Sequence, residues 1–172
     1  MHTSEGLELP TTAEGAAAIM RAPKECDSLV QYLKAFDVSL SVMQHVHAVR
    51  RIVVEACEDA AMDGVRYLEL RFAPMLHTRG DLELAEVMDA VLEGKAHAEL
   101  ALPIVVGILV CGIRHLDPAV VEQQASLAWL YRDRGVVGFD LAGPEAGFSS
   151  LLHERAFGAR GHKLKSDGLF CY

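Results

Sequence analysis

The chain has 172 residues, of which 51% are apolar, enough to bury the core of one domain of ordinary size. Its formal net charge of −8 argues against a nucleic-acid partner, because a nucleic-acid binder needs a basic face to neutralise phosphate. The first ten residues carry no apolar leader, and the longest apolar run, 101–113, is too short to cross a bilayer as a helix. The 4 cysteines form no C-x-x-C pair, which favours free thiols in a reducing compartment. A cytoplasmic protein with no membrane partner is predicted.

The first third of the chain predicts helices. Residues up to about Glu25 are mixed in character and predict no regular element. Between 28 and 36, apolar side chains recur at the i, i+3, i+4, i+7 spacing of one helix face; they are Leu29, Tyr32, Leu33 and Phe36. A longer helix is predicted from about Ser41 to Met62, with Gly64 as its natural stop.

Beyond Gly64, the pattern alternates between strands and helices. The predicted strands are 65–74, 101–113 and 136–143, and the predicted helices are 81–100, 118–134 and about 151–160. Such alternation implies parallel strands joined by helical crossovers. Two architectures fit this order, an open doubly wound sheet or part of a (β/α)₈ barrel. An open nucleotide-binding sheet would usually carry a glycine-rich turn, and neither G-x-G-x-x-G nor a P-loop occurs here.

The chain contains a His-x-His pattern, formed by His45 and His47, which raises the question of a metal site. On a strand, residues i and i+2 point the same way and can converge on one metal ion. On a helix they lie about 200° apart around the axis. Because the surrounding pattern is helical, we expect the two rings to point apart and to bind no metal.

Charged residues lie near the ends of the predicted strands, where parallel α/β folds place their sites. Glu69 and Arg71 share one face of the first strand. Asp140 is expected on the face of the third strand opposite Val137 and Phe139. Charges that face a barrel interior need partners. From spacing alone, a functional site and a structural ion-pair network are equally compatible with this pattern.

Three segments resemble the adenosine deaminase family of metal-dependent hydrolases: GVRYLELRFAP (64–74), RHLDP (114–118) and GVVGFDLAGPE (135–145). The resemblance runs from about Leu7 to about Leu164. It implies a (β/α)₈ barrel whose complete form deaminates a purine nucleoside with a zinc-activated water. Within the enzymes, an adenine deaminase or a deaminase of a modified adenosine is the alternative.

The resemblance also assigns roles to residues of this chain. Gly143 matches the glycine whose backbone N–H bonds a purine ring nitrogen, and a glycine suits this role because backbone can approach a flat ligand closely. The apolar lid helix that covers the nucleoside is matched by Leu29, Tyr32, Leu33 and Phe36, with ordinary core packing as the alternative. Charged positions that would support the site are matched by Asp140, Glu69, Arg71 and Arg114.

The family's zinc ligands and catalytic glutamate find no match here. Its His-x-His precedes the matched segment, and its His-Ala-Gly-Glu would follow ARGHKL (159–164), where a divergent tail, 165–172, stands instead. We therefore expect one partial barrel domain, 1–172, with about three of the eight strands, family strands two to four. Zinc belongs to the complete fold, none is expected on this chain, and an inactive fragment is the leading interpretation. The alternative is a non-catalytic pseudoenzyme or interaction module, which would self-associate through unpaired sheet edges.

Overall fold

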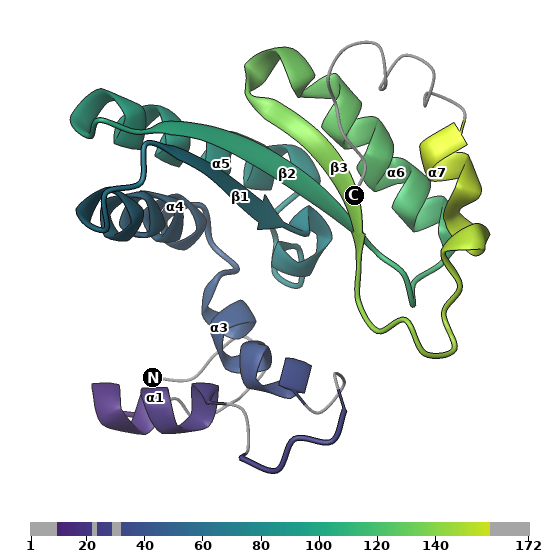
Figure 1. Ribbon diagram of the computed structural model, residues 1–172, viewed down its shortest axis with the longest axis horizontal. Helices are drawn as coiled ribbons and strands as arrows, with labels where there is room; N and C mark the ends of the chain where they lie inside the picture. Colours follow the sequence, from purple (N-terminus) through teal and green to yellow (C-terminus); the bar gives the residue numbers. More distant parts are fainter. Residues whose placement is uncertain (1–9, 22–23, 29–31, 159–172) are drawn as a thin grey trace.

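A three-stranded parallel sheet organises the chain in the computed structural model, which describes residues 10–21, 24–28 and 32–158 (Figure 1). The strands are β1 (Tyr67–Phe72), β2 (Val105–Ile113) and β3 (Val136–Ala142), in the order β1-β2-β3. Tyr67 pairs with Val105, and the β1–β2 register continues in step to the end of β1. The predicted α/β partial barrel with three parallel strands is confirmed.

Helices cover one face of this sheet and also form a smaller group beside it. The α-helices are α1 (Ala13–Met20), α3 (Asp37–Val42), α4 (Val46–Met62), α5 (Leu84–Ala101), α6 (Pro118–Leu130) and α7 (Glu154–Gly158). The 3-10 helices are η1 (Lys34–Phe36), η2 (Pro74–His77), η3 (Arg132–Arg134) and η4 (Ser150–His153). Helices α1 and α3 lie below the sheet in Figure 1, apart from α4, α5 and α6. None of the helices in the described ranges is long and apolar enough to cross a membrane.

One main hydrophobic core fills the space between the sheet and α4, α5 and α6. It includes Val53 of α4, Met88 of α5, Ile108 of β2, Val121 of α6 and Phe139 of β3. Two helices of this core also approach each other closely, and a glycine allows this where α4 meets α5. A Cβ on Gly94 would lie 2.8 Å from the Arg50 carbonyl oxygen and 2.9 Å from Cβ of Val53. No larger residue fits there without moving one helix.

The structure corrects the helices predicted before β1. Alanine-rich α1 forms where no element was predicted, and the hydroxyl of its N-cap residue, Thr12, accepts a hydrogen bond from the Gly15 N–H at 3.1 Å. The predicted helix from about Ser41 is wrong at its start, because α3 ends at Val42 and α4 begins at Val46. The break has a local cause: the Gln44 side chain donates to the Leu40 carbonyl oxygen at 2.8 Å, satisfying an acceptor at the end of α3.

The elements at the two ends of the prediction also differ. In the helix predicted over 28–36, residues 29–31 lie outside the described residues, 32 and 33 are α-helical, and the chain continues through η1 into α3. The helix predicted over about 151–160 is η4 followed by the short α7, while 159–172, including the divergent tail, is outside the described chain. The strands and the helices between them are therefore the part of the prediction that the fold supports best.

Candidate functional site

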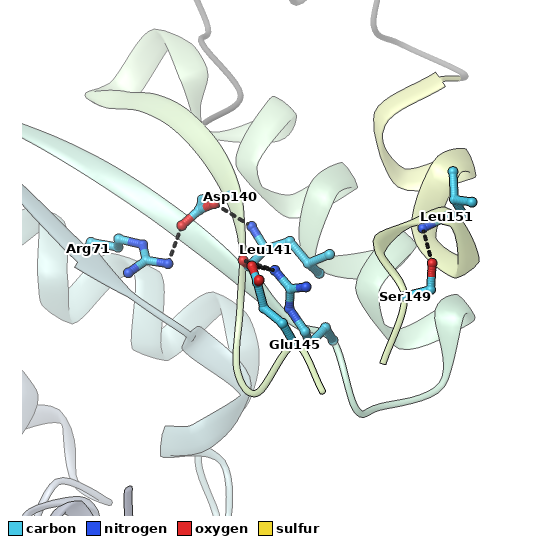
Figure 2. Close-up of polar contacts among 7 residues, drawn as sticks. Arg71, Asp140, Leu141, Glu145, Ser149 and Leu151 are labelled. Atoms are coloured by element: carbon cyan, nitrogen blue, oxygen red, sulfur yellow. Dashed lines mark hydrogen bonds and ion pairs between the residues drawn. The ribbon is translucent and has the colours of Figure 1, made fainter. Parts of the chain in front are cut away.

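Two strands place opposite charges on the sheet face turned away from α4, α5 and α6. Along β1, the side chains alternate as predicted, with Arg71 exposed and Leu70 packed against the core. The Arg71 guanidinium forms an ion pair with the Asp140 carboxylate of β3, reaching across β2 (Figure 2). The second carboxylate oxygen of Asp140 accepts the Leu141 backbone N–H at 2.7 Å. Both oxygens of Asp140 are thus partnered, which keeps this half-buried charge in place.

A buried thiol lies beside this ion pair. Cys111 pairs with Asp140 in the β2–β3 ladder and is 3% exposed. Burial raises the pKa of the Cys111 thiol to about 11, with the Arg71 charge opposing the rise and the Asp140 charge adding to it. The thiol is therefore neutral at physiological pH and adds no third charge to the pair.

The third strand departs from simple alternation. The β2–β3 register shifts between Ile108 and Leu109, so β3 carries an extra residue at this point. A Cβ on Gly107 would lie 2.7 Å from Cγ2 of Val137 and 3.2 Å from the Tyr67 hydroxyl. Val137 thus shares a face with Tyr67 of β1. The prediction that Val137 lies opposite Asp140 is wrong, because an alternation argument has no means of anticipating a bulge.

Glu69 is not brought into the ion pair. Its carboxylate accepts a hydrogen bond from the Tyr67 hydroxyl at 2.7 Å. This bond raises the pKa of the Tyr67 phenol, with smaller contributions from burial and from the Glu69 charge. Glu69 therefore anchors a neighbour on its own strand, whereas Arg71, one step closer to the strand end, pairs with Asp140.

Arg114 holds the turn in which Gly143 lies. Its backbone N–H donates to the Ala142 carbonyl oxygen at 2.9 Å, and its guanidinium lies 3.3 Å from the Glu145 carboxylate. Gly143 has a φ of 104°, a left-handed conformation that side chains rarely adopt. A Cβ at this position would lie 3.4 Å from Cγ of Arg114. On the other side, Nε2 of His153, a residue that is 1% exposed, lies 2.9 Å from the Arg114 carbonyl oxygen.

A cavity of about 590 Å³ opens where the strand ends meet the segment that contains η1 and α3. Gly143 and His115 line one side, and Leu33, Phe36 and Asp37 line the other. Most of the remaining wall is apolar, as in sites that bury a small ligand. Two of the predicted lid residues, Leu33 and Phe36, are therefore at the cavity, together with Arg71 and Gly143.

The other two predicted lid residues are placed differently. The Tyr32 ring packs against Phe36, with 5.5 Å between the ring centroids, and is not among the lining residues. Leu29 lies outside the described residues. Gln44 and His77 had no assigned role, yet both are buried and form hydrogen bonds with Leu76 and Met43, which line the cavity. No sequence pattern marks Gln44, because a polar residue inside a predicted helix is normally a solvent-facing one.

The geometry predicted for His45 and His47 is wrong. His45 is the N-cap of α4 with extended backbone angles, φ −137° and ψ 143°, so it lies outside the helical repeat. The two rings stack face to face, with centroids 5.6 Å apart and planes inclined by 4°. Across the described residues, no group of three or more His, Cys, Asp or Glu side chains could hold a metal ion. Zinc sites use three or four protein ligands, so this donor set does not fit a zinc ion.

Comparison with known proteins identifies the class of this partial barrel. The family model for adenosine deaminase matches residues 2–167, and the chain belongs to that family. A probable adenosine deaminase of Dictyostelium discoideum is 47% identical over 168 residues, which are 97% of this chain and 21% of that protein. An adenosine deaminase of Mycolicibacterium vanbaalenii is 45% identical over 150 residues, 84% of this chain and 41% of the relative. The chain thus spans less than half the length of these curated relatives.

A solved structure agrees with this assignment. The Arabidopsis ADAL protein in complex with GMP superposes with a TM-score of 0.73 at 28% identity. The superposition covers 92% of this chain and 47% of that protein. The resemblance seen in the sequence segments around β1, β2 and β3 is confirmed.

The Arg71–Asp140 ion pair should stabilise the fold more than a fully surface-located pair does. The side chains are 49% and 14% exposed, against 76% and 45% for Arg51 and Glu55, which form a bridge of 2.7 Å within α4. In a double-mutant cycle with Arg71→Met and Asp140→Asn, measured by urea unfolding, we expect a coupling free energy of about 1 kcal/mol.

The matched control is a cycle with Arg51→Met and Glu55→Gln, for which we expect a coupling below about 0.5 kcal/mol. Equal coupling in the two cycles would show that the interior position of Asp140 adds nothing to the pair.

Proposed function

We propose that this chain forms the purine-binding wall of an adenosine deaminase-type site and does not deaminate a nucleoside by itself. The observation that carries the proposal is Gly143, which combines a left-handed backbone, no side chain and a place on the cavity wall. A backbone N–H in such a turn can approach the edge of a flat heterocycle closely. The family assignment supports a purine nucleoside as the ligand, with adenine or a modified adenosine as the alternative substrate.

Apolar side chains would hold the two faces of the base and sugar. Leu33 and Phe36 line the cavity opposite Gly143, and Tyr32 supports Phe36 from outside. Leu29 completes the proposed lid in the sequence pattern. Burying a purine ring against such side chains is favourable because apolar surface of both partners is removed from water.

The charged residues are proposed to support the wall. Arg114 fixes the turn at Gly143, and the Arg71–Asp140 pair fixes the ends of β1 and β3. Glu69 acts further from the cavity, through its bond to Tyr67. None of these residues is assigned a bond-breaking role.

Zinc, when bound in an enzyme of this type, activates the water that attacks the purine. The described residues provide no ligand set for it, so no chemical step is assigned to this chain. Binding and chemistry are separable, because contacts made equally in ground and transition states give affinity without turnover.

The lack of turnover can be tested directly. Purified protein is incubated with adenosine and one equivalent of zinc, and inosine is measured by chromatography. We expect no inosine above the amount formed in buffer alone. The same incubation with a full-length family enzyme is the positive control. Inosine formation that scales with protein concentration would contradict the proposal.

The role of Gly143 can be tested by binding. Gly143→Ala should weaken adenosine binding about tenfold or more in calorimetry, equivalent to about 1.4 kcal/mol, because the backbone must move away from the ligand. Gly147→Ala is a matched control: Gly147 also has a positive φ, 82°, but nothing lies within 4 Å of the added Cβ. Equal effects of the two variants would assign the loss to backbone strain alone.

We also propose that the chain self-associates, as an interaction module would. In the described sheet β1 and β3 each pair with β2 alone, and the apolar side chains of Tyr67 and Val105 are 55% and 58% exposed. Unpaired strand edges and exposed apolar surface favour association.

Sedimentation at rising concentration should give masses above the 18.7 kDa of one chain. The double variant Tyr67→Lys and Val105→Lys should shift the equilibrium toward monomer. Leu130→Lys, on α6 and 69% exposed, should leave it unchanged. A monomer at all concentrations would contradict the proposal.

A further inference from the structure

One buried side chain joins the segment before α4 to the loop after β1. Gln44 has a polar side chain, yet the residue is only 2% exposed. Its Nε2 donates to the carbonyl oxygens of Leu40 and Leu76, at 2.8 Å and 2.9 Å. Its Oε1 accepts the Arg79 backbone N–H at 2.9 Å. The bonds with Leu76 and Arg79 connect two segments more than thirty residues apart, and the bond to Leu40 fixes the amide within its own segment.

A histidine adds a second connection between the same segments. His77 is 7% exposed, and its Nδ1 lies 3.0 Å from the Met43 carbonyl oxygen. Since a carbonyl oxygen only accepts, Nδ1 carries the proton in this contact. Burial lowers the pKa of His77, the bond to Met43 opposes the change and the Arg79 charge adds to it, so the ring is neutral near pH 7.

These bonds lie directly behind the cavity wall. Leu40 and Met43 line the cavity from one segment, and Leu76 and His77 line it from the other. The same hydrogen bonds therefore fix the spacing between the two sides of the wall.

The segment that leads into α4 has little apolar burial of its own. Helix α1 has no buried residue, and α3 buries only Ser41. Helices are normally held in a protein by packing of an apolar face, and here that contribution is small. The hydrogen bonds with Leu76, His77 and Arg79 must then contribute much of the attachment of this segment to the rest of the fold.

We propose that Gln44 and His77 are positioning residues, forming a clamp that holds the cavity wall Asp37–Met43, and with it Leu33 and Phe36, against the loop after β1. The clamp is the set of three hydrogen bonds that cross between the two segments, which join Gln44 to Leu76 and Arg79, and His77 to Met43. Its effect on nucleoside binding rests on the proposed function, whereas its effect on the wall itself does not.

The structure offers a matched comparison for Gln44. Gln124 of α6 is 0% exposed, and neither its Nε2 nor its Oε1 has a hydrogen-bond partner within the described part of the chain. Replacing each glutamine by methionine keeps the size and removes the amide. Only Gln44→Met breaks connections to the wall, so the pair separates loss of the clamp from the general effect of a buried Gln→Met change.

Hydrogen–deuterium exchange of the ligand-free chain tests the clamp. Gln44→Met should raise the exchange rate of amides 38–43 about tenfold or more and leave β2 and α5 unchanged, while Gln124→Met should change neither. A uniform rise across the chain in Gln44→Met, or no rise at 38–43, would overturn the proposal.

Variants of His77 provide an independent test, which can still be carried out if Gln44→Met fails to fold. Asparagine can place an N–H close to the position of Nδ1, whereas leucine cannot. His77→Leu should raise exchange at 38–43, and His77→Asn should restore much of the protection. Equal exchange in the two variants would show that the bond to Met43 does not hold the wall.

Adenosine titration separates the clamp from the proposed function. If the native chain binds adenosine, His77→Leu should weaken binding about threefold to tenfold and His77→Asn should recover most of it, because the wall is pre-organised again. Unchanged affinity in His77→Leu would overturn the positioning role. If the native chain binds no adenosine, the proposed function fails, and the exchange measurements still decide whether the clamp holds the wall.

Discussion

The parallel ladder of β1, β2 and β3 brings three carboxyl ends to the same edge of the sheet, because helical crossovers return the chain to the same starting side each time. Residues remote in sequence, such as His77, His115 and Gly143, reach one cavity for this reason. The ladder also fixes the distance between β1 and β3, which the long Arg71 side chain spans to reach Asp140. The position of the site and its electrostatics both follow from the strand order.

The two faces of the sheet meet different physical demands. On the helix side, Ile108 and Phe139 are almost fully buried, and the close packing there tolerates no added atoms at Gly94. On the other side, charges are present and must be satisfied locally, which Asp140 achieves through Arg71 and the Leu141 N–H. Cys111 fits between them because its burial keeps the thiol protonated. A third formal charge at that position would oppose one member of the pair.

The sequence was informative wherever structure depends on a local period. Alternation correctly placed Arg71 and Leu70 on opposite faces of β1, and the order of the elements predicted the parallel sheet. The glycine in the DLAGPE segment was assigned to the site through its resemblance, and its positive φ gives a physical reason for the residue type. The structure places Gly143 on the cavity wall, and its role toward a ligand stays a prediction.

The failures share a different cause, since each depends on a contact between distant segments. Val137 changes face because the β2–β3 register shifts, and a strand's own sequence does not reveal its partner's register. His45 leaves the helix at a break that Gln44 stabilises through bonds to Leu40, Leu76 and Arg79. A periodic pattern contains no information about such partners, and it therefore extended the helix through the break.

The break at Gln44 also changes what the His-x-His pattern means. Outside the helical repeat, His45 turns its ring parallel to that of His47, and the two exposed rings meet face to face. Ligation requires nitrogen lone pairs that converge on one point with further ligands around it, and stacking brings together ring faces instead. Within the part of the chain that the structure describes, no third ligand joins these two rings. What the break does create is the clamp, so a segment that looks like a metal motif in sequence is connected to the wall of the cavity instead.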